Sequence, residues 1–404
     1  MNMIGKTEGE PTDAYAMPEL KEDFAPEVDL ASRWLGGSVL AASDESFGEK
    51  ESLLTPTPSA FVPGNYGPRG EIVDGWETKR RREPGHDWAL IRLGAAGIIT
   101  GIDVDTSFFT GNFPTTCRIE ACGVENYPGP NALLSSETEW VEIVPRSPLK
   151  GDAHNRFDVS DGRRFTHVRL SAFPDGGIAR LRVYGHVLPD PRLFDRLTID
   201  LASQDHGGQV VTSSDGFYTS AAVLNRPDKA RNMGDGWETR RRRDDGNDHA
   251  IFRLALPGHV RLVEIDTAHF KYNASAEVAL SGAAFAGADG WAPLLSRRPL
   301  QPDTRHVFRL PEGAAVSYVR LDAYPDGGIS RVRLWGKVDP AARRAAGYRW
   351  FNALPAGQAR QVLAEGGVLA GVAERLIATR PLTEAAIASF GDADLVGVKA
   401  MLEG

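Results

Sequence analysis

A stretch of nine residues with many ionisable side chains occurs twice in this chain. The first copy is Asp74-Gly75-Trp76-Glu77-Thr78-Lys79-Arg80-Arg81-Arg82, and the second is Asp235-Gly236-Trp237-Glu238-Thr239-Arg240-Arg241-Arg242-Arg243. Guanidinium groups grip carboxylates through two parallel hydrogen bonds, and carboxylates can transfer protons. Because the copies lie 161 residues apart (235 − 74), they indicate an internal duplication. The stretch predicts a site for a small anion.

The arginines of each copy separate into two groups if the run lies on a strand, where alternate side chains face opposite sides. A solvated, charged strand is the simplest alternative, but repetition of the whole stretch favours a binding site. Glu77 and Glu238 each follow a tryptophan, so they are poorer candidates to share a pocket with the indole. We expect substrate to be bound by Asp74, Trp76, Arg80, Arg82, Asn112, Asp235, Trp237, Arg241 and Arg243.

Histidines and neighbouring acids are the candidates for proton transfer. His86 precedes Asp87, which could fix the tautomer of its ring, but Asn247 takes its place in the second copy. His269 likewise has Phe108 as its counterpart. Most acids near the arginines would offset charge repulsion, and the sequence leaves open which of them acts as a base. We predict catalytic roles for His86, Asp87, Asp248 and His269.

Bulk composition limits the class of protein. The 404 residues suffice for two or three domains, and a formal net charge of −8 argues against nucleic acid as the partner of the basic runs. No signal-peptide core or bilayer-spanning run is present. Cys117 and Cys122 lie five apart on an expected strand and would face opposite sides, which fits neither a disulfide framework nor a zinc site. We expect a cytoplasmic protein without a cofactor and leave a divalent cation open.

The remaining residues predict an all-β architecture in two tandem β-sandwiches with a short helical tail. Apolar and charged residues alternate in short runs such as Arg180–Val183 and Arg331–Leu334, between turns rich in Gly, Pro and Asp. The first copy carries an insertion within Pro56–Gly70, which we interpret as a loop. The expected units are an N-terminal arm (1–28), the first repeat (29–188), the second repeat (197–338) and a helical tail (340–404).

Several motifs together resemble allantoicase. In the first repeat these motifs are 35–44, 74–78, 85–88, 103–106 and 110–112, and in the second they are 232–243 and 266–270. The resemblance covers about residues 29–338. It implies two jelly-roll domains of the galactose-binding-like kind, hydrolysis of allantoate to ureidoglycolate and urea in purine breakdown, and a homo-oligomer. Phe108 and Asn247 depart from the family pattern, so that one pseudo-equivalent site is inactive or the working site straddles the repeats.

The implied substrate agrees with the repeated residues. Arginine suits the carboxylate of allantoate, and asparagine or acidic side chains suit its ureido N–H groups. Departure of urea needs a proton on the leaving nitrogen and activation of water, which a carboxylate or a histidine can supply. A non-catalytic jelly-roll binding protein and an enzyme that processes ureidoglycolate remain as alternatives.

The tail has a resemblance of its own. Phe351–Pro355 and Ala378–Pro381 resemble the start of ureidoimidazoline decarboxylase. The later catalytic residues of that enzyme have no counterpart here, so the tail is predicted to serve packing or assembly.

Overall fold

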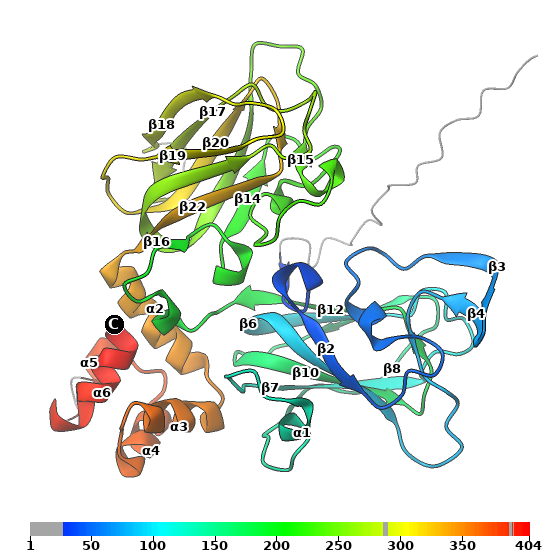
Figure 1. The fold of residues 1–404 in the computed structure, drawn as a ribbon. Helices are drawn as coiled ribbons and strands as arrows, with labels where there is room; N and C mark the ends of the chain where they lie inside the picture. Colours follow the sequence, from blue (N-terminus) through cyan, green and yellow to red (C-terminus); the bar gives the residue numbers. More distant parts are fainter. Residues whose placement is uncertain (1–26, 286–289, 388–389, 391) are drawn as a thin grey trace, which may run out of the picture.

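Two β-sandwiches and a helical tail make up the part of the chain that the computed structural model describes, residues 27–285, 290–387, 390 and 392–404. Residues 1–26 of the predicted N-terminal arm lie outside it. The second sandwich stands above the tail in Figure 1, and the first sandwich lies to the right of the tail. The predicted all-β class with two tandem sandwiches and a helical tail is confirmed.

One long strand organises the first sandwich. β6 (Asp87–Asp105) pairs through its first part with β2 and β10, and through its last part with β9 and β12. One layer of the sandwich therefore contains the first part of β6 with β2 and β10, and the other layer contains its last part with β9 and β12. All of these pairings are antiparallel. Its inward side chains, such as Ile91 and Val104, are fully buried between the sheets, as period-two alternation requires. The other strands of this sandwich are β1 (Val28–Asp29), β2 (Ser38–Ala42), β7 (Thr116–Cys122), β8 (Val141–Pro148), β9 (His154–Asp158), β10 (Arg164–Phe173) and β12 (Arg180–Val187).

The second sandwich repeats this topology. Its long strand is β16 (Asp248–Asp266), and the order β13-β22-β16-β20-β17-β18 matches β1-β12-β6-β10-β7-β8 in the first. Equal strand order confirms the predicted duplication. The other strands are β13 (Ile199–Asp200), β14 (Gln209–Ser213), β17 (Glu277–Ala283), β18 (Ala292–Pro299), β19 (Arg305–Arg309), β20 (Val316–Tyr324) and β22 (Arg331–Val338).

Short elements close one end of each sandwich. β5 (Trp76–Glu77) pairs with β11 (Gly177–Ile178), and β15 (Trp237–Glu238) pairs with β21 (Gly328–Ile329). The insertion of the first copy is not only a loop, because β3 (Phe61–Gly67) and β4 (Gly70–Val73) form a hairpin that projects from the first sandwich (Figure 1). The short helices are η1 (Arg33–Leu35), η2 (Lys50–Leu54), α1 (Pro130–Leu133), η3 (Pro191–Phe194), η4 (Gln204–His206), η5 (Ala221–Val223) and η6 (Met233–Asp235).

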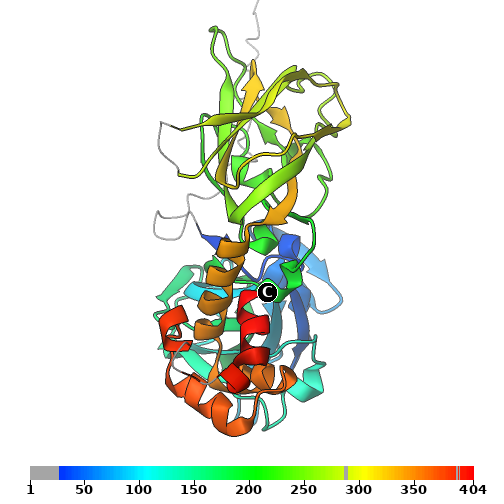
Figure 2. The same ribbon diagram turned by 90° about the vertical axis from the view of Figure 1, so that its left-hand side faces the viewer.

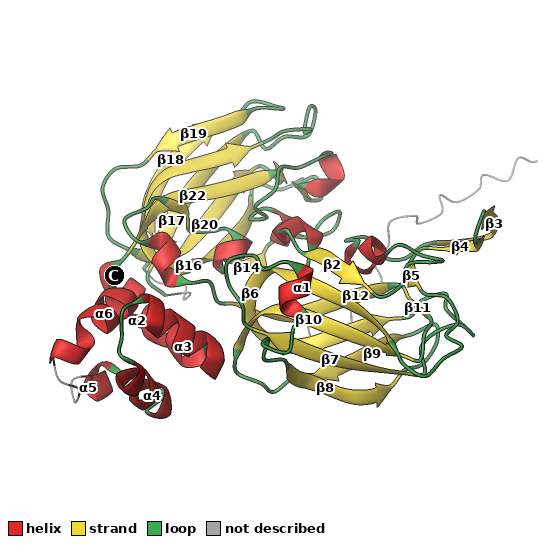
Figure 3. Ribbon diagram, turned by 60° about the horizontal axis from the view of Figure 1, so that its bottom comes forward, coloured by secondary structure: helices red, strands yellow, loops and turns green. Residues whose placement is uncertain are grey.

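The tail packs as a helical unit against both sandwiches. Asp339 caps the first helix by accepting from the backbone N–H groups of Ala341 and Ala342. Trp350, Phe351 and other apolar side chains form a separate core, and the helices gather below the second sandwich in Figures 2 and 3. The helices are α2 (Pro340–Ala353), α3 (Ala356–Glu365), α4 (Ala370–Ala378), α5 (Glu384–Ile387) and α6 (Asp392–Glu403).

The two cysteines are buried on opposite faces of β7, as predicted. Cys117 belongs to the core of the first sandwich, and Cys122 belongs to a small cluster with Leu90 and Leu133. Both are free, and burial raises the pKa of each thiol to about 12. Among the described residues, no helix is long and apolar enough to cross a membrane.

Candidate functional site

The tryptophans of the repeated stretch belong to the cores. Trp76 and Trp237 are 0% exposed, and their indole N–H groups donate to the backbone oxygens of Asp44 and Asp215 at 2.8 and 2.9 Å. Packing in the core accounts for both tryptophans, and their role in substrate binding stays a prediction. Packing also explains the preceding glycine, because a Cβ at Gly75 would lie 2.7 Å from the ring of Phe109.

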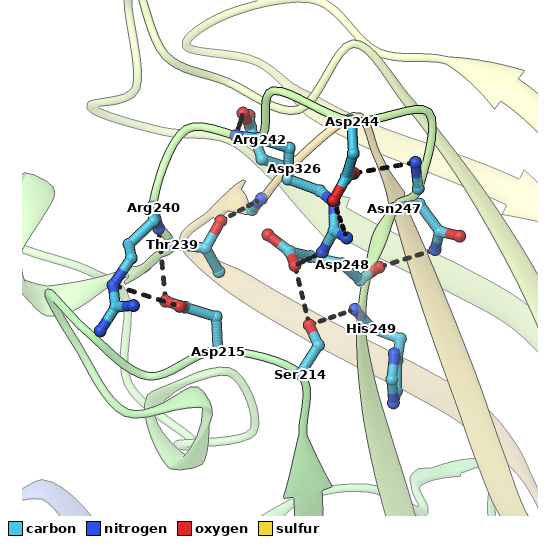
Figure 4. Close-up of polar contacts among 12 residues, drawn as sticks. Ser214, Asp215, Thr239, Arg240, Arg242, Asp244, Asn247, Asp248, His249 and Asp326 are labelled. Carbon is cyan, nitrogen blue, oxygen red and sulfur yellow. Dashed lines mark hydrogen bonds and ion pairs between the residues drawn. The ribbon is translucent and has the colours of Figure 1, made fainter.

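The arginine run is a loop rather than a strand, and its middle arginine is structural. Arg81 donates to Asp87 at 2.7 Å, and Arg242 donates to Asp248 at 2.8 Å. In the first repeat Ser43 donates to the same carboxylate oxygen of Asp87, and Figure 4 shows the second network, in which Ser214 plays this part. Each aspartate is 1% exposed, and its second carboxylate oxygen has no partner among the described residues. The catalytic roles of Asp87 and Asp248 stay predictions. They anchor the loop to the start of the long strand.

The flanking arginines extend from this anchored loop into solvent. The backbone N–H of Arg81 donates to Asp175 at 2.8 Å, and that of Arg242 donates to Asp326 at 3.0 Å, so a glycine turn fixes each loop. Four arginines are exposed, and none of their side chains has a partner among the residues that the structure describes: Arg80, Arg82, Arg241 and Arg243. Their role in substrate binding stays a prediction.

The acids that open the stretch are engaged in ion pairs. Asp74 accepts from the buried Arg180 at 2.5 Å. Asp235 accepts from Arg231 at 2.8 Å, and its backbone oxygen accepts from Arg331 at 2.6 Å. These contacts tie the stretch to the strand that follows the glycine turn. Structural anchoring therefore accounts for Asp74 and Asp235 without a substrate.

The structure does not bring the candidate histidines together. The ring of His86 stacks on Phe173 with centroids 4.5 Å apart, and burial, followed by the charge of Arg118, lowers its pKa. His269 lies exposed in the other repeat, and its Nε2–H donates to the backbone oxygen of Ala230 at 3.0 Å. Their catalytic roles stay predictions, and neither residue lines the cavities described next.

A loop-end cavity of about 460 Å³ gives the repeated glutamate an environment suited to chemistry. Glu77 is half-buried and accepts from Asn112 Nδ2 at 2.7 Å. Burial raises the pKa of Glu77, although the Asn112 hydrogen bond lowers it. Arg69 contributes a cation from the hairpin, and the other lining residues are Phe47, Phe61, Gly70, Glu71, Val73, Phe108, Thr110 and Asp152.

Glu77 lines this cavity, but it is not among the site residues predicted from the sequence. The expectation that it faces away from Trp76 is correct, since the indole is buried in the core and the carboxylate lines the cavity. The predicted pocket lies on the indole side, whereas this cavity lies on the side of Glu77. The useful signal was the recurrence of Glu with Asn, because Asn273 donates to Glu238 at 2.7 Å in the second repeat.

A second cavity of about 320 Å³ shares Phe108 as a wall. His154 Nδ1 lies 2.8 Å from Asp103 Oδ2, and this hydrogen bond raises the pKa of the histidine. In the second repeat the corresponding strands pair Arg305 with Glu264 at 2.5 Å. The second repeat thus has an arginine, Arg305, at the position where the first has the titratable His154. Among the described residues, no group of three or more His, Cys, Asp or Glu side chains is placed to hold a metal ion.

Comparisons with known proteins identify the family. The model of the allantoicase repeat matches residues 28–188 and 199–339. The chain belongs to the allantoicase family. The family predicted from the sequence is thus confirmed, and with it an enzyme of the hydrolase class.

The aligned regions cover nearly the whole length of each relative. A probable allantoicase of Streptomyces coelicolor is 46% identical over 84% of this chain and 93% of its own. A probable allantoicase of Nocardia farcinica is 51% identical over 78% of this chain and 95% of its own. The crystal structure of allantoicase from Saccharomyces cerevisiae matches with a TM-score of 0.66 and 35% identity, over 77% of this chain and 93% of its own. The allantoicase chain and this chain therefore share both repeats.

Proposed function

We propose that this chain hydrolyses allantoate to ureidoglycolate and urea in the loop-end cavity of its first repeat. Family membership supports the reaction and the small-molecule substrate. The observation that carries the site is Glu77, a half-buried carboxyl with a raised pKa that faces this cavity beside Asn112 and Arg69. A polar substrate of about a dozen heavy atoms fits a cavity of this size.

The reaction follows from the chemistry of these side chains. The guanidinium of Arg69 holds the substrate carboxylate. Protonated Glu77 gives its proton to the ureido nitrogen that leaves the central carbon, and urea departs. The resulting carboxylate then accepts a proton from the water that adds to this carbon, which yields ureidoglycolate and restores the acid. Asn112 holds the carboxyl of Glu77 in place through the bond at 2.7 Å.

Two alternatives make different predictions for the same assay. A ureidoglycolate-processing enzyme would release urea from ureidoglycolate faster than from allantoate, because the second ureido group would find no partners. A non-catalytic binding protein would release none from either. We expect urea from allantoate at a kcat/KM at least about a hundredfold above that for ureidoglycolate. Equal or reversed rates would reject the proposed reaction.

Further features of the proposal rest on the sequence. The exposed arginines Arg80 and Arg82 are proposed to attract the anionic substrate, as Arg241 and Arg243 are in the second repeat. We also propose that the protein acts in the cytoplasm and forms a homo-oligomer. The chain is proposed to divide into a first repeat (29–188), a second repeat (197–338) and a tail (340–404) that serves packing. Size-exclusion chromatography with light scattering tests the oligomer.

A further inference from the structure

A third cavity, of about 860 Å³, lies where the first sandwich, the segment that joins the repeats, the start of the second repeat and α3 meet. It is separate from the loop-end cavity and shares no lining residue with it. From the first sandwich it is lined by Arg92 and by three residues of β10, Arg164, Thr166 and His167. Helix α3 supplies Gln358, and Figure 3 shows this helix lying beside the first sandwich.

Three of the side chains that line the cavity are buried and have a polar atom without a partner: Arg164, His167 and Gln358. Arg164 is 2% exposed; its Nε donates to the backbone oxygen of Leu188 at 2.6 Å and its Nη1 to Glu125 at 2.5 Å. Its Nη2 has no partner among the described residues. His167 is also 2% exposed, and its Nε2 has no partner among them either. Oε1 of Gln358, which is 4% exposed, likewise has no partner among the described residues. A buried polar group without a partner is costly, so the buried acceptors of His167 and Gln358 point to a ligand.

The protonation of His167 defines what its open atom can do. Nδ1 lies 2.8 Å from the hydroxyl of Thr166, which itself donates to the backbone oxygen of Val124 at 3.0 Å. Burial, followed by the charge of Arg92, lowers the pKa of His167 to about 4, so the ring is neutral at pH 7. Nδ1 then carries the proton and donates to Thr166, and Nε2 is an acceptor.

The cations here have open donors. Two of the four lining acids are paired with cations, and the other two, Asp205 and Glu365, accept from Ser203 and Gln361. Arg92 is the cross-strand neighbour of His167. It donates through Nε to Ser38 and through Nη2 to Gly36, and its Nη1 has no partner among the described residues. By contrast, Glu125 accepts from both Arg164 and Gln358, and Asp190 accepts from Arg192. The open atoms are therefore two guanidinium donors and two acceptors, the imidazole Nε2 of His167 and Oε1 of Gln358.

We propose that this junction cavity binds a small organic carboxylate that carries a neighbouring N–H group. The carboxylate accepts from Arg92 and Arg164, and the N–H donates to His167. Because Glu125 joins Arg164 to Gln358 of α3, with contacts of 2.5 and 2.6 Å, the bound molecule also strengthens the docking of the tail. The second repeat has Ala315 and Tyr318 where the first has Arg164 and His167, so the site belongs to the first repeat alone.

The ligand chemistry is tested with three probes on the full-length chain by isothermal titration calorimetry. N-carbamoylglycine carries both groups, acetate only the carboxylate, and urea only the N–H. We expect saturable binding of N-carbamoylglycine, at least about tenfold weaker binding of acetate, and none of urea. No saturable heat with N-carbamoylglycine, or equal affinity for acetate, would overturn the proposal.

The place of binding is tested with matched variants. Arg92→Gln and His167→Phe should each weaken the binding of N-carbamoylglycine by at least about tenfold. Arg253→Gln changes the counterpart of Arg92 in the second repeat and should alter the affinity less than about twofold. Hydrogen exchange of α3 should slow when the probe is added to the wild-type chain. Equal effects of Arg92→Gln and Arg253→Gln, or protection confined to the loops around Glu77, would contradict the assignment.

Discussion

The loop ends of the two repeats carry the same Glu–Asn pair in different surroundings. Asn112 donates to Glu77 and Asn273 donates to Glu238, each at 2.7 Å. In the first repeat the β3–β4 hairpin and Phe108 wall this pair into a cavity. In the second, Asn273 Nδ2 also lies 3.3 Å from the sulfur of Met233. Duplication thus provided the pair twice, and the insertion encloses it in one copy.

Beneath these loop ends the two repeats agree closely. Each has a buried tryptophan, a buried aspartate paired with the middle arginine, and a glycine turn that holds the arginine loop. These contacts lie inside the protein, where packing tolerates little change. At the loop ends the repeats differ in the exposed hairpin of the first copy, and exposed segments are where new function can arise without loss of the fold.

The largest effect is expected from the glutamates. Glu77→Gln removes the proposed proton donor and should lower kcat/KM for allantoate by about 10²–10⁴-fold. Glu238→Gln makes the same change in the repeat without the hairpin and should change kcat/KM by less than about threefold. Urea release measures both variants. Equal losses would mean that both loop ends, or neither, perform the reaction.

A loss of stability of similar size is expected from both middle arginines. Arg81→Met and Arg242→Met each leave an aspartate, Asp87 or Asp248, buried without its charged partner. Each should lower the free energy of unfolding by about 2–3 kcal/mol, measured by denaturant titration. This pair sharpens the comparison, because the buried layer should respond equally in the two repeats. A much larger loss in one repeat would show that the layers are not equivalent.

Replacing the asparagines should also affect activity differently in the two repeats, but less than replacing the glutamates. Asn112→Ala should lower kcat by about tenfold, because a hydrogen bond to the acid is lost. The Asn112 bond lowers the pKa of Glu77, so its loss raises that pKa further, and the fall of the rate at high pH should move to higher pH. Asn273→Ala is the control. A pH–rate profile unchanged by Asn112→Ala would remove this residue from the account.

The hairpin cation should act on binding. Arg69→Gln is expected to raise KM by about five- to tenfold with little change in kcat, because the carboxylate is held equally in ground and transition states. Arg240→Gln, an exposed arginine of the second repeat, should leave KM unchanged. Steady-state kinetics distinguish the cases, and a loss confined to kcat would assign Arg69 to the chemical step instead.

The smallest effect concerns stability against pH. The Asp103 contact raises the pKa of His154 above its unfolded value, so its stabilisation is complete below about pH 6.5 and is lost as pH rises through the folded pKa. The melting temperature should fall slightly from about pH 6 to pH 8, and His154→Gln should remove this slope. Arg305→Gln, at the corresponding position of the second repeat, should lower the melting temperature equally at pH 6 and pH 8. A slope that persists in His154→Gln would point to another group.

The sequence predicted the fold better than the site, and the reason is physical. Repeated motifs and period-two alternation report which side chains are buried, so the two sandwiches and the tail could be predicted. The same alternation placed Glu77 opposite Trp76, yet it does not tell which side faces a cavity. That depends on the hairpin, whose proline and glycine residues indicate a loop when only the sequence is considered. Ion pairs across the chain, such as Asp74 with Arg180, could not be predicted either, because they join residues far apart in sequence.

The central claim is that the first repeat's loop end holds the substrate. A crystal structure of Glu77→Gln soaked with allantoate tests it most directly, since the variant should bind the molecule without turning it over. The account predicts electron density for allantoate beside residues 77 and 112, with its carboxylate on Arg69. Density at Glu238 and His269, with an empty first-repeat cavity, would contradict it.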